Sequence, residues 1–227
     1  MAYILNIETA TDICSVAIAE NDTLLSLAET TESFQHAAQL THLIDTCLQD
    51  TTLKMKDLDA VAVSQGPGSY TALRVGTSTA KGIAYALQLP LIAVDTLQSL
   101  AHAGSEIYHR DILYCPMIDA RRMEVYAAIY NFQNMAVTET QAIIVDENSF
   151  SSYFASDNSI VFIGNGAEKC RSVIHSPLAI FHPLKCSAKY LVKLAYQAFQ
   201  NNLFQDVAYY APQYFKAPNI TTPKKIL

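Results

Sequence analysis

Residues 2–29 read AYILNIETATDICSVAIAENDTLLSLAE. This segment holds three short apolar runs, at 2–8, 13–20 and 24–29, which are separated by polar turn residues. Short apolar runs between turn signals are typical of buried strands. Because the links between the runs are tight, we expect the three strands to form an antiparallel meander.

Helical and strand patterns alternate after the meander. The expected elements are a helix at 34–50, a buried strand at 60–64, a long helix at 69–88, a strand at 91–94 and a short helix at 96–103. Pro90 explains why the long helix ends where it does, since proline cannot continue a helix. The predicted order of this first half is therefore βββαβαβ.

A similar order begins again at Asp111. The expected strands lie at 112–118, 124–130, 136–145 and 160–163, and the expected helices lie at 147–154 and 188–203. We predict an α/β fold of two lobes, residues 1–104 and 105–227, with the boundary somewhere in 103–110. Duplicated βββαβα halves are the architecture of the actin, hexokinase and Hsp70 (ASKHA) superfamily, in which a nucleotide sits between the lobes. An architecture alone does not establish a function.

The hydrophobic content and net charge of the chain exclude several classes of protein. The 227 residues are 51% hydrophobic, which is ample for a packed core, and 15 basic against 21 acidic residues give a net charge of -6. This charge disfavours binding to nucleic acid without a partner's basic surface. The first residues lack the basic region of a signal peptide, and no apolar run reaches the length of a membrane span. We therefore expect a cytoplasmic protein that does not enter a membrane.

Two predicted helices carry wide apolar faces. On the helix at 34–50 the apolar stripe spans roughly 160°, and on the helix at 69–88 a row of small residues lies within an apolar face of more than half the circumference. The stripes could simply cover the chain's own sheet, or they could also meet a partner. We predict that they form a partner interface that consists of His36, Leu40, Leu43, Ile44, Cys47, Ala72, Gly76, Ala80 and Ala84.

Several glycine-containing turns resemble ligand-binding loops. Gly66-Pro67-Gly68-Ser69 precedes the second helix and could hold an anion, but it lacks the lysine of a P-loop. A tight turn with Ser69 as the helix N-cap is the favoured alternative. The vestigial nucleotide contacts that we predict are Glu8, Gly66, Gly68, Ser69, Gly164 and Gly166.

The segment from Asp119 to Tyr126 lies where a phosphate-binding relative would have a glycine-rich hairpin. It contains no glycine, serine or threonine. Arg121 and Arg122 could still meet phosphate or a partner's carboxylate, although a solvated charged turn is the simpler expectation for one of them.

Catalytic and metal sites are not predicted. A helical metal pair needs histidines three or four residues apart, whereas His36 and His42 are six apart and the residue four after His36 is Leu40. The five cysteines include no C-x-x-C pair and are expected to be reduced thiols. We therefore expect no catalytic residues, no bound metal and no cofactor.

Four stretches resemble the signature stretches of the TsaB family. They are Ile7-Glu8-Thr9-Ala10-Thr11, His36 at the start of the first helix, the run GPGSYTALRVG at 66–76, and DARRMEVY at 119–126. The resemblance is firm over the N-terminal half and looser beyond it. Ala72 and Met123 stand where that family often has glycine, which affects only local backbone freedom.

This resemblance implies a non-catalytic scaffold subunit for tRNA N6-threonylcarbamoyladenosine (t6A) modification. Such a chain is an inactive paralogue of the metal-dependent, glycoprotease-like TsaD, which transfers a threonylcarbamoyl group to the adenosine beside the anticodon. The implied partners are a TsaD-like catalytic subunit, a TsaE-like ATPase in the wider assembly, a second copy of the chain when it is alone, and tRNA only through the complex. The helical H-x-x-x-H metal pair of TsaD-like chains is absent from this sequence. The alternative from another class is an ATP-dependent small-molecule kinase of the same superfamily, and a metalloprotease is a weaker third.

Overall fold

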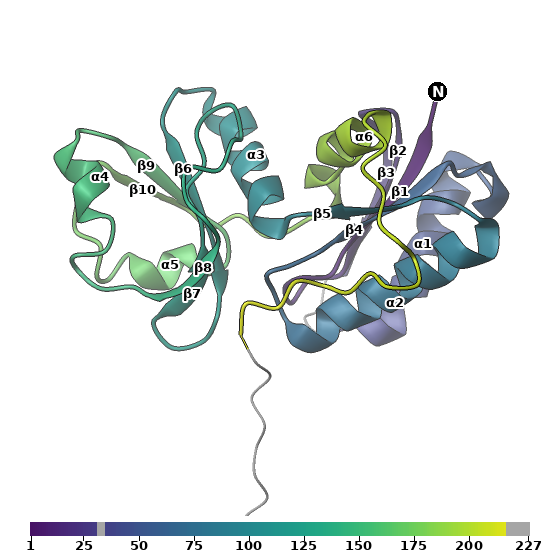
Figure 1. Cartoon of the computed structure of the whole chain (residues 1–227), viewed down its shortest axis with the longest axis horizontal. Helices are drawn as coiled ribbons and strands as arrows, with labels where there is room; N and C mark the ends of the chain where they lie inside the picture. The colour runs from purple at the N-terminus through teal and green to yellow at the C-terminus, as the bar shows by residue number, and fades with distance from the viewer. Residues whose placement is uncertain (31–34, 217–227) are drawn as a thin grey trace, which may run out of the picture.

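The computed structural model describes residues 1–30 and 35–216, which form two five-stranded mixed sheets side by side, each flanked by helices (Figure 1). The strand orders are β3-β2-β1-β4-β5 and β10-β9-β6-β7-β8. The described helices lack the combination of length and apolar character that crossing a membrane requires.

The first sheet contains the predicted meander. Strands β1, β2 and β3 are antiparallel neighbours, and β4 and β5 continue the sheet in parallel to β1. Their bounds are Tyr3–Glu8, Ser15–Glu20, Thr23–Glu29, Ala60–Ser64 and Leu91–Val94. Helices α1 (His36–Thr51) and α2 (Tyr70–Leu87) cover one face, and α6 (Val192–Gln200) covers the other (Figure 1). Phe34, the expected first residue of α1, lies outside the described residues.

The second sheet repeats the plan of the first. Strands β6, β7 and β8 form an antiparallel meander, and β9 and β10 extend it in parallel to β6. Their bounds are Leu113–Asp119, Glu124–Ala127, Gln141–Ile144, Ile160–Ile163 and Ala179–His182. Its helices are α3 (Thr96–Tyr108), α4 (Ser151–Ala155) and α5 (Ala167–Cys170). The prediction of a duplicated two-lobed α/β fold is confirmed.

Some predicted elements differ in extent. The expected strand 136–145 contains only β8, and α5 and β10 were not predicted at all. The expected helix 188–203 is a 3-10 turn, Ala188–Tyr190, followed by α6. The turn is tighter than an α-helix because its backbone N–H groups bond three residues back, and the Ala188 N–H donates to Ser15 Oγ at 2.8 Å.

The two lobes exchange elements, which corrects the predicted division at 104/105. Helix α3 crosses that point and packs on β6 and β9 of the second sheet. A side chain on Gly104 would place its Cβ 2.1 Å from Ile163 Cδ1, so the helix lies directly on the sheet. Helix α6, from the far end of the chain, packs on β1 and β5 of the first sheet, where Leu191 and Ala195 join a buried cluster. A local pattern shows that a helix is amphipathic but not which sheet it covers.

The last described residues, 205–216, form what we call the C-terminal strap. Gln205 pairs with Leu91 at the edge of the first sheet, and the strap then runs along α2 and ends beside β7 of the second lobe (Figure 1). Lys81 of α2 donates to the carbonyl oxygens of Ala208 and Tyr210 at 3.2 and 2.9 Å. The strap therefore touches both lobes.

Candidate functional site

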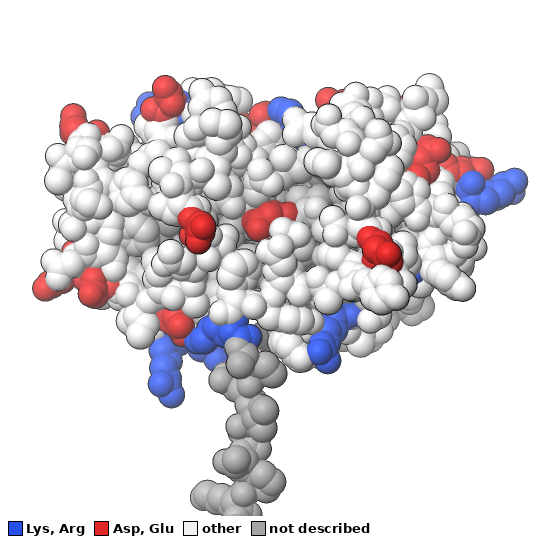
Figure 2. All heavy atoms as spheres, in the orientation of Figure 1, with Lys and Arg blue, Asp and Glu red and all other residues white. Residues whose placement is uncertain are grey.

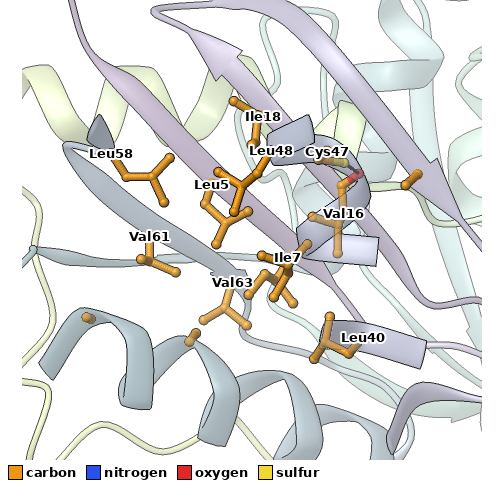
Figure 3. Close-up of a cluster of buried hydrophobic side chains, with 14 of the residues drawn as sticks. Leu5, Ile7, Val16, Ile18, Leu40, Cys47, Leu48, Leu58, Val61 and Val63 are labelled. Carbon is orange, nitrogen blue, oxygen red and sulfur yellow. Dashed lines mark hydrogen bonds between the residues drawn. The ribbon is translucent and has the colours of Figure 1, made fainter. Parts of the chain in front are cut away.

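The apolar stripe of α1 faces the first sheet. Leu40 and Cys47 point toward Ile7 and Val16 in the buried cluster drawn in Figure 3. Cys47 Sγ donates to the Val16 carbonyl oxygen at 3.4 Å, and both side chains are almost fully buried. The stripe therefore stabilises the lobe itself through burial of apolar surface.

The small-residue row of α2 allows close approach to the same lobe. An ideal Cβ on Gly76 would lie only 2.2 Å from Thr9 Oγ1, so the helix backbone packs directly on the turn after β1. Ala80 and Ala84 belong to the same core cluster as the buried side chains of α1. The row thus serves contacts within the chain.

These contacts correct the predicted interface. Of the nine predicted residues only Leu43 is half-buried, and the other eight are buried in the described chain: His36, Leu40, Ile44, Cys47, Ala72, Gly76, Ala80 and Ala84. They are buried because α1 and α2 must cover both the sheet and each other. The prediction was wrong to assign these side chains to a partner.

A different surface of the two helices remains exposed or half-buried. We call it the outer helix face, and it consists of Leu43, Thr71, Val75, Ser78, Thr79, Gly82, Ile83 and Ala86. None of these side chains is charged. An ideal Cβ on Gly82 would meet nothing within 4 Å, so this part of α2 is open.

Glu8, a predicted nucleotide contact, is fully buried. Its Oε1 accepts a hydrogen bond of 2.6 Å from the Ala10 N–H, whereas Oε2 has no partner among the described residues. Burial raises the pKa of this carboxyl to about 7, despite hydrogen bonds to Ala10 and Ser64 that lower it. In this conformation Glu8 cannot reach a ligand.

The turn at Gly66-Pro67-Gly68 is packed against the chain itself. An ideal Cβ on Gly68 would lie 2.2 Å from the Ala10 carbonyl oxygen, and the Ser69 N–H donates to that same oxygen at 2.7 Å. On the other side, the Gln213 carbonyl oxygen of the strap would lie 2.9 Å from a Cβ on Gly66. Ser69 occupies the N-cap of α2, although its side chain makes no capping bond. The groups that would face an anion therefore face protein.

The turn at Gly164-Asn165-Gly166 also has a packing role. Gly164 has a φ of +110°, and a Cβ there would lie 2.4 Å from the Met117 carbonyl oxygen. The Gly166 N–H donates to that oxygen at 2.9 Å, and Asn165 Oδ1 accepts from the Asp119 N–H at 3.0 Å. The turn thus fastens α5 to the end of β6.

His36 and the cysteines are internal groups. His36 Nε2 lies 3.3 Å from the Ile13 carbonyl oxygen, and burial lowers the pKa of its ring. All five cysteines are free and buried. Within residues 1–30 and 35–216, no three His, Cys, Asp or Glu side chains are grouped so that they could hold a metal ion.

Two cavities lie away from the predicted nucleotide contacts. One, of about 270 Å³, is bounded by α3, α6 and residues 132–134, and the other, of about 160 Å³, lies beside β7 and β8. None of the six predicted nucleotide residues lines either cavity.

The contribution of the C-terminal strap was missed from the sequence. The Tyr214 ring packs on the Tyr70 ring at an interplanar angle of 40° with ring centroids 4.6 Å apart, and Arg74 Nε donates to the Tyr214 hydroxyl at 3.2 Å. Lys216 forms an ion pair with Glu124 of β7. Residues 205–216 show neither helical nor strand periodicity, and their only signal is a high content of tyrosine.

Known proteins resemble this chain over most of its length. A family model described as TsaD, tRNA N6-adenosine threonylcarbamoyltransferase, matches residues 30–226. The tRNA threonylcarbamoyladenosine biosynthesis protein TsaB of Bacillus subtilis is 29% identical over 77% of this chain and 76% of its own length. TsaB of Escherichia coli is 33% identical over 63% of each chain.

Solved structures share the fold. YeaZ from Pseudomonas aeruginosa has a TM-score of 0.83 at 24% identity, covering 94% of this chain and all of the other. Component A of the (R)-2-hydroxyglutaryl-CoA dehydratase of Acidaminococcus fermentans has a TM-score of 0.51 at 10% identity, covering 89% of this chain and all of the other. The expected ASKHA-type architecture is confirmed.

Proposed function

Because this chain belongs to the family described as TsaD, tRNA N6-adenosine threonylcarbamoyltransferase, we propose that it acts in the biosynthesis of tRNA threonylcarbamoyladenosine. The names of the TsaB proteins of B. subtilis and E. coli state this pathway for those relatives. Within it, the chain serves as a non-catalytic scaffold that binds and activates a TsaD-like catalytic subunit.

The main support for a non-catalytic role is that the residues predicted to contact a nucleotide are packed against the chain itself. The carboxyl of Glu8 is buried, and the backbone at Gly68 is closed by the Ala10 carbonyl oxygen. A site for phosphate needs donors that point at the ligand. In this chain the corresponding donor, the Ser69 N–H, is already bonded within the protein. The sequence also lacks a helical H-x-x-x-H pair.

The outer helix face supports the role in partner binding. It is uncharged over several turns of α2, and it includes the half-buried apolar side chains of Leu43, Val75 and Ile83. Interfaces are depleted of charge at their centre, and small side chains allow two helices to approach closely. A TsaD-like helix pair would cover this surface in the assembly. A second copy of the chain covers it when the partner is absent.

The wider assembly follows from the same role. A TsaE-like ATPase completes it, and tRNA reaches the catalytic subunit in the complex. The kinase alternative lacks support, because the segment from Asp119 to Glu124 has neither the glycine nor the hydroxyl that a phosphate-binding hairpin uses.

The test is reconstitution with a TsaD-like chain and an unmodified tRNA. We expect threonylcarbamoyl transfer only when both proteins are present, and none by this chain alone. The variants Leu43→Asp and Ile83→Asp should weaken the pairing, whereas Ile107→Asp, at a 45% exposed position on α3, should not. Transfer that is equally fast without this chain, or pairing that survives both interface variants, would contradict the proposal.

A further inference from the structure

The hairpin between β6 and β7 holds two consecutive arginines in an unfavourable backbone conformation. Arg121 and Arg122 have φ of 74° and 51°, a region that favours glycine and asparagine. The conformation is fixed by the turn, since the Glu124 N–H donates to the Arg121 carbonyl oxygen at 3.1 Å and the Arg121 N–H donates to Asp119 Oδ1 at 2.8 Å. Such strain on bulky residues is often retained where the side chains have a function.

The guanidinium groups of Arg121 and Arg122 are also available to bind a ligand. Both residues are exposed, and no ion pair or hydrogen bond joins either side chain to the described part of the chain. The acids beside them are already occupied, because Asp119 pairs with Lys169 and Glu124 pairs with Lys216. The positive charge of the hairpin tip is therefore not neutralised locally.

Aromatic rings continue this surface toward the first lobe. The Arg74 guanidinium lies 4.2 Å from the centre of the half-buried Tyr70 ring, and the neighbouring Tyr214 ring is 39% exposed. Figure 2 shows Lys and Arg side chains gathered along the lower edge of this view, on both sides of the point where the described chain ends. The strap residues Tyr214 and Lys216 connect the two halves of this edge.

The charge of this edge is opposite to that of the whole chain. Five cations, Arg74, Arg121, Arg122, Lys169 and Lys216, accompany the two acids Asp119 and Glu124, which leaves three positive charges locally in a protein of net charge -6. Clustered cations raise the local concentration of anions even on an acidic protein.

We propose that this edge, with Arg121 and Arg122 at its centre, binds the phosphate backbone of RNA. Arginine suits phosphate because its planar fork gives two parallel hydrogen bonds. The Tyr214 ring, which is 39% exposed, adds a face on which an unpaired base stacks, which an acidic protein partner would not use. The inference rests on the proposed role in tRNA modification and assigns part of the RNA contact to this chain. Because the rest of the chain is acidic, the edge adds to the affinity of the assembly and gives only weak binding alone.

The decisive variant is Arg121→Asn combined with Arg122→Gly. Both new residues tolerate positive φ, so we expect an unchanged or higher Tm. The assembly with a TsaD-like chain should bind a tRNA transcript roughly tenfold more weakly at 0.1 M salt, with a log–log salt slope shallower by about 1.4 to 1.8, since two phosphate contacts are lost. The matched control is Arg110→Asn with Lys56→Asn, which removes two exposed positive charges elsewhere and should leave both values unchanged.

Three outcomes overturn the inference. The first is a folded double variant whose assembly binds the transcript with the wild-type affinity and salt slope. The second is an equal loss in the control, which would mean that only net charge matters. The third is weaker binding of the TsaD-like chain itself, measured without RNA, which would make the edge a protein contact. If the wild-type chain fails to bind the TsaD-like chain at all, the proposed function fails separately, and the transcript is then titrated against this chain alone at low salt.

Discussion

Two glycines on α2 provide a matched test of which surface of the helix is internal. An alanine at either position should favour the helix by about 1 kcal/mol relative to glycine. At Gly82 nothing lies within 4 Å of the new Cβ, so Gly82→Ala should keep this gain and raise Tm by about 2 to 4 °C. At Gly76 the new Cβ would lie 2.2 Å from Thr9 Oγ1 and 3.1 Å from its Cγ2. Overpacking of this kind costs about 1 to 3 kcal/mol, so Gly76→Ala should range from neutral to about 2 kcal/mol destabilising.

Affinity for a partner should depend on Gly82, whereas stability of the fold depends on Gly76. Gly82→Leu leaves the fold intact but fills the outer helix face, and a misfit of about 1 to 3 kcal/mol at an interface weakens binding roughly five- to 150-fold. Thermal unfolding followed by circular dichroism, together with calorimetric titration against a TsaD-like chain, measures both effects. A Gly82→Leu variant with normal Tm and normal affinity would remove the outer helix face from the interface. A Gly76→Ala variant more stable than Gly82→Ala would refute the packing of α2 on Thr9.

Three further predictions concern buried and strapped groups. The pKa of Glu8 is raised to about 7 in the folded chain. The protonated carboxyl therefore contributes fully to the stability of the fold below about pH 4, and this contribution is lost as the pH rises through 7. Glu8→Gln should therefore be more stable than the wild type at pH 8, by about 3 kcal/mol in urea titrations, and no more stable at pH 4. Tyr214→Ala should lower the free energy of unfolding by about 1 to 2 kcal/mol, because it removes a ring pair and an arginine contact, while Tyr209→Ala, at a position 88% exposed, should change nothing measurable. The buried cysteines should react with a thiol reagent only as fast as the protein opens, and rapid labelling of the native protein would contradict their burial.

The fold was largely predictable because its strands carry strong local signals. The apolar runs of β1, β2 and β4 and the turn at Gly66-Pro67-Gly68 all lie where the pattern placed them. Strand β10 gave no such signal, since each of its four residues is only half-buried and its run is short. The long C-terminal helix was predicted as continuous because periodicity does not distinguish a 3-10 turn from the start of an α-helix.

The predicted partner interface failed for a different reason. A helical projection identifies apolar residues such as Leu40 and Ile44, but it does not say whether a sheet or another protein covers them. Only the packing of α1 on β2 and α2 assigns them to the core. The residues exposed on the outer helix face, such as Gly82 and Ser78, are small or polar and therefore inconspicuous in a sequence. The role of the C-terminal strap could not be predicted from local patterns either, because its contacts with Tyr70 and Glu124 join parts of the chain that are far apart in sequence.

The return of α6 to the first sheet has a consequence for synthesis of the chain on the ribosome. One face of that sheet, with Ile4, Ala62 and Ile92, is complete in sequence once β5 has emerged, yet Leu191 and Ala195 cover it. At ordinary elongation rates the intervening residues take about 5 to 20 s to appear. During that interval the nascent chain exposes an apolar sheet face that a chaperone can recognise. The N-terminal lobe thus matures last, although it is translated first.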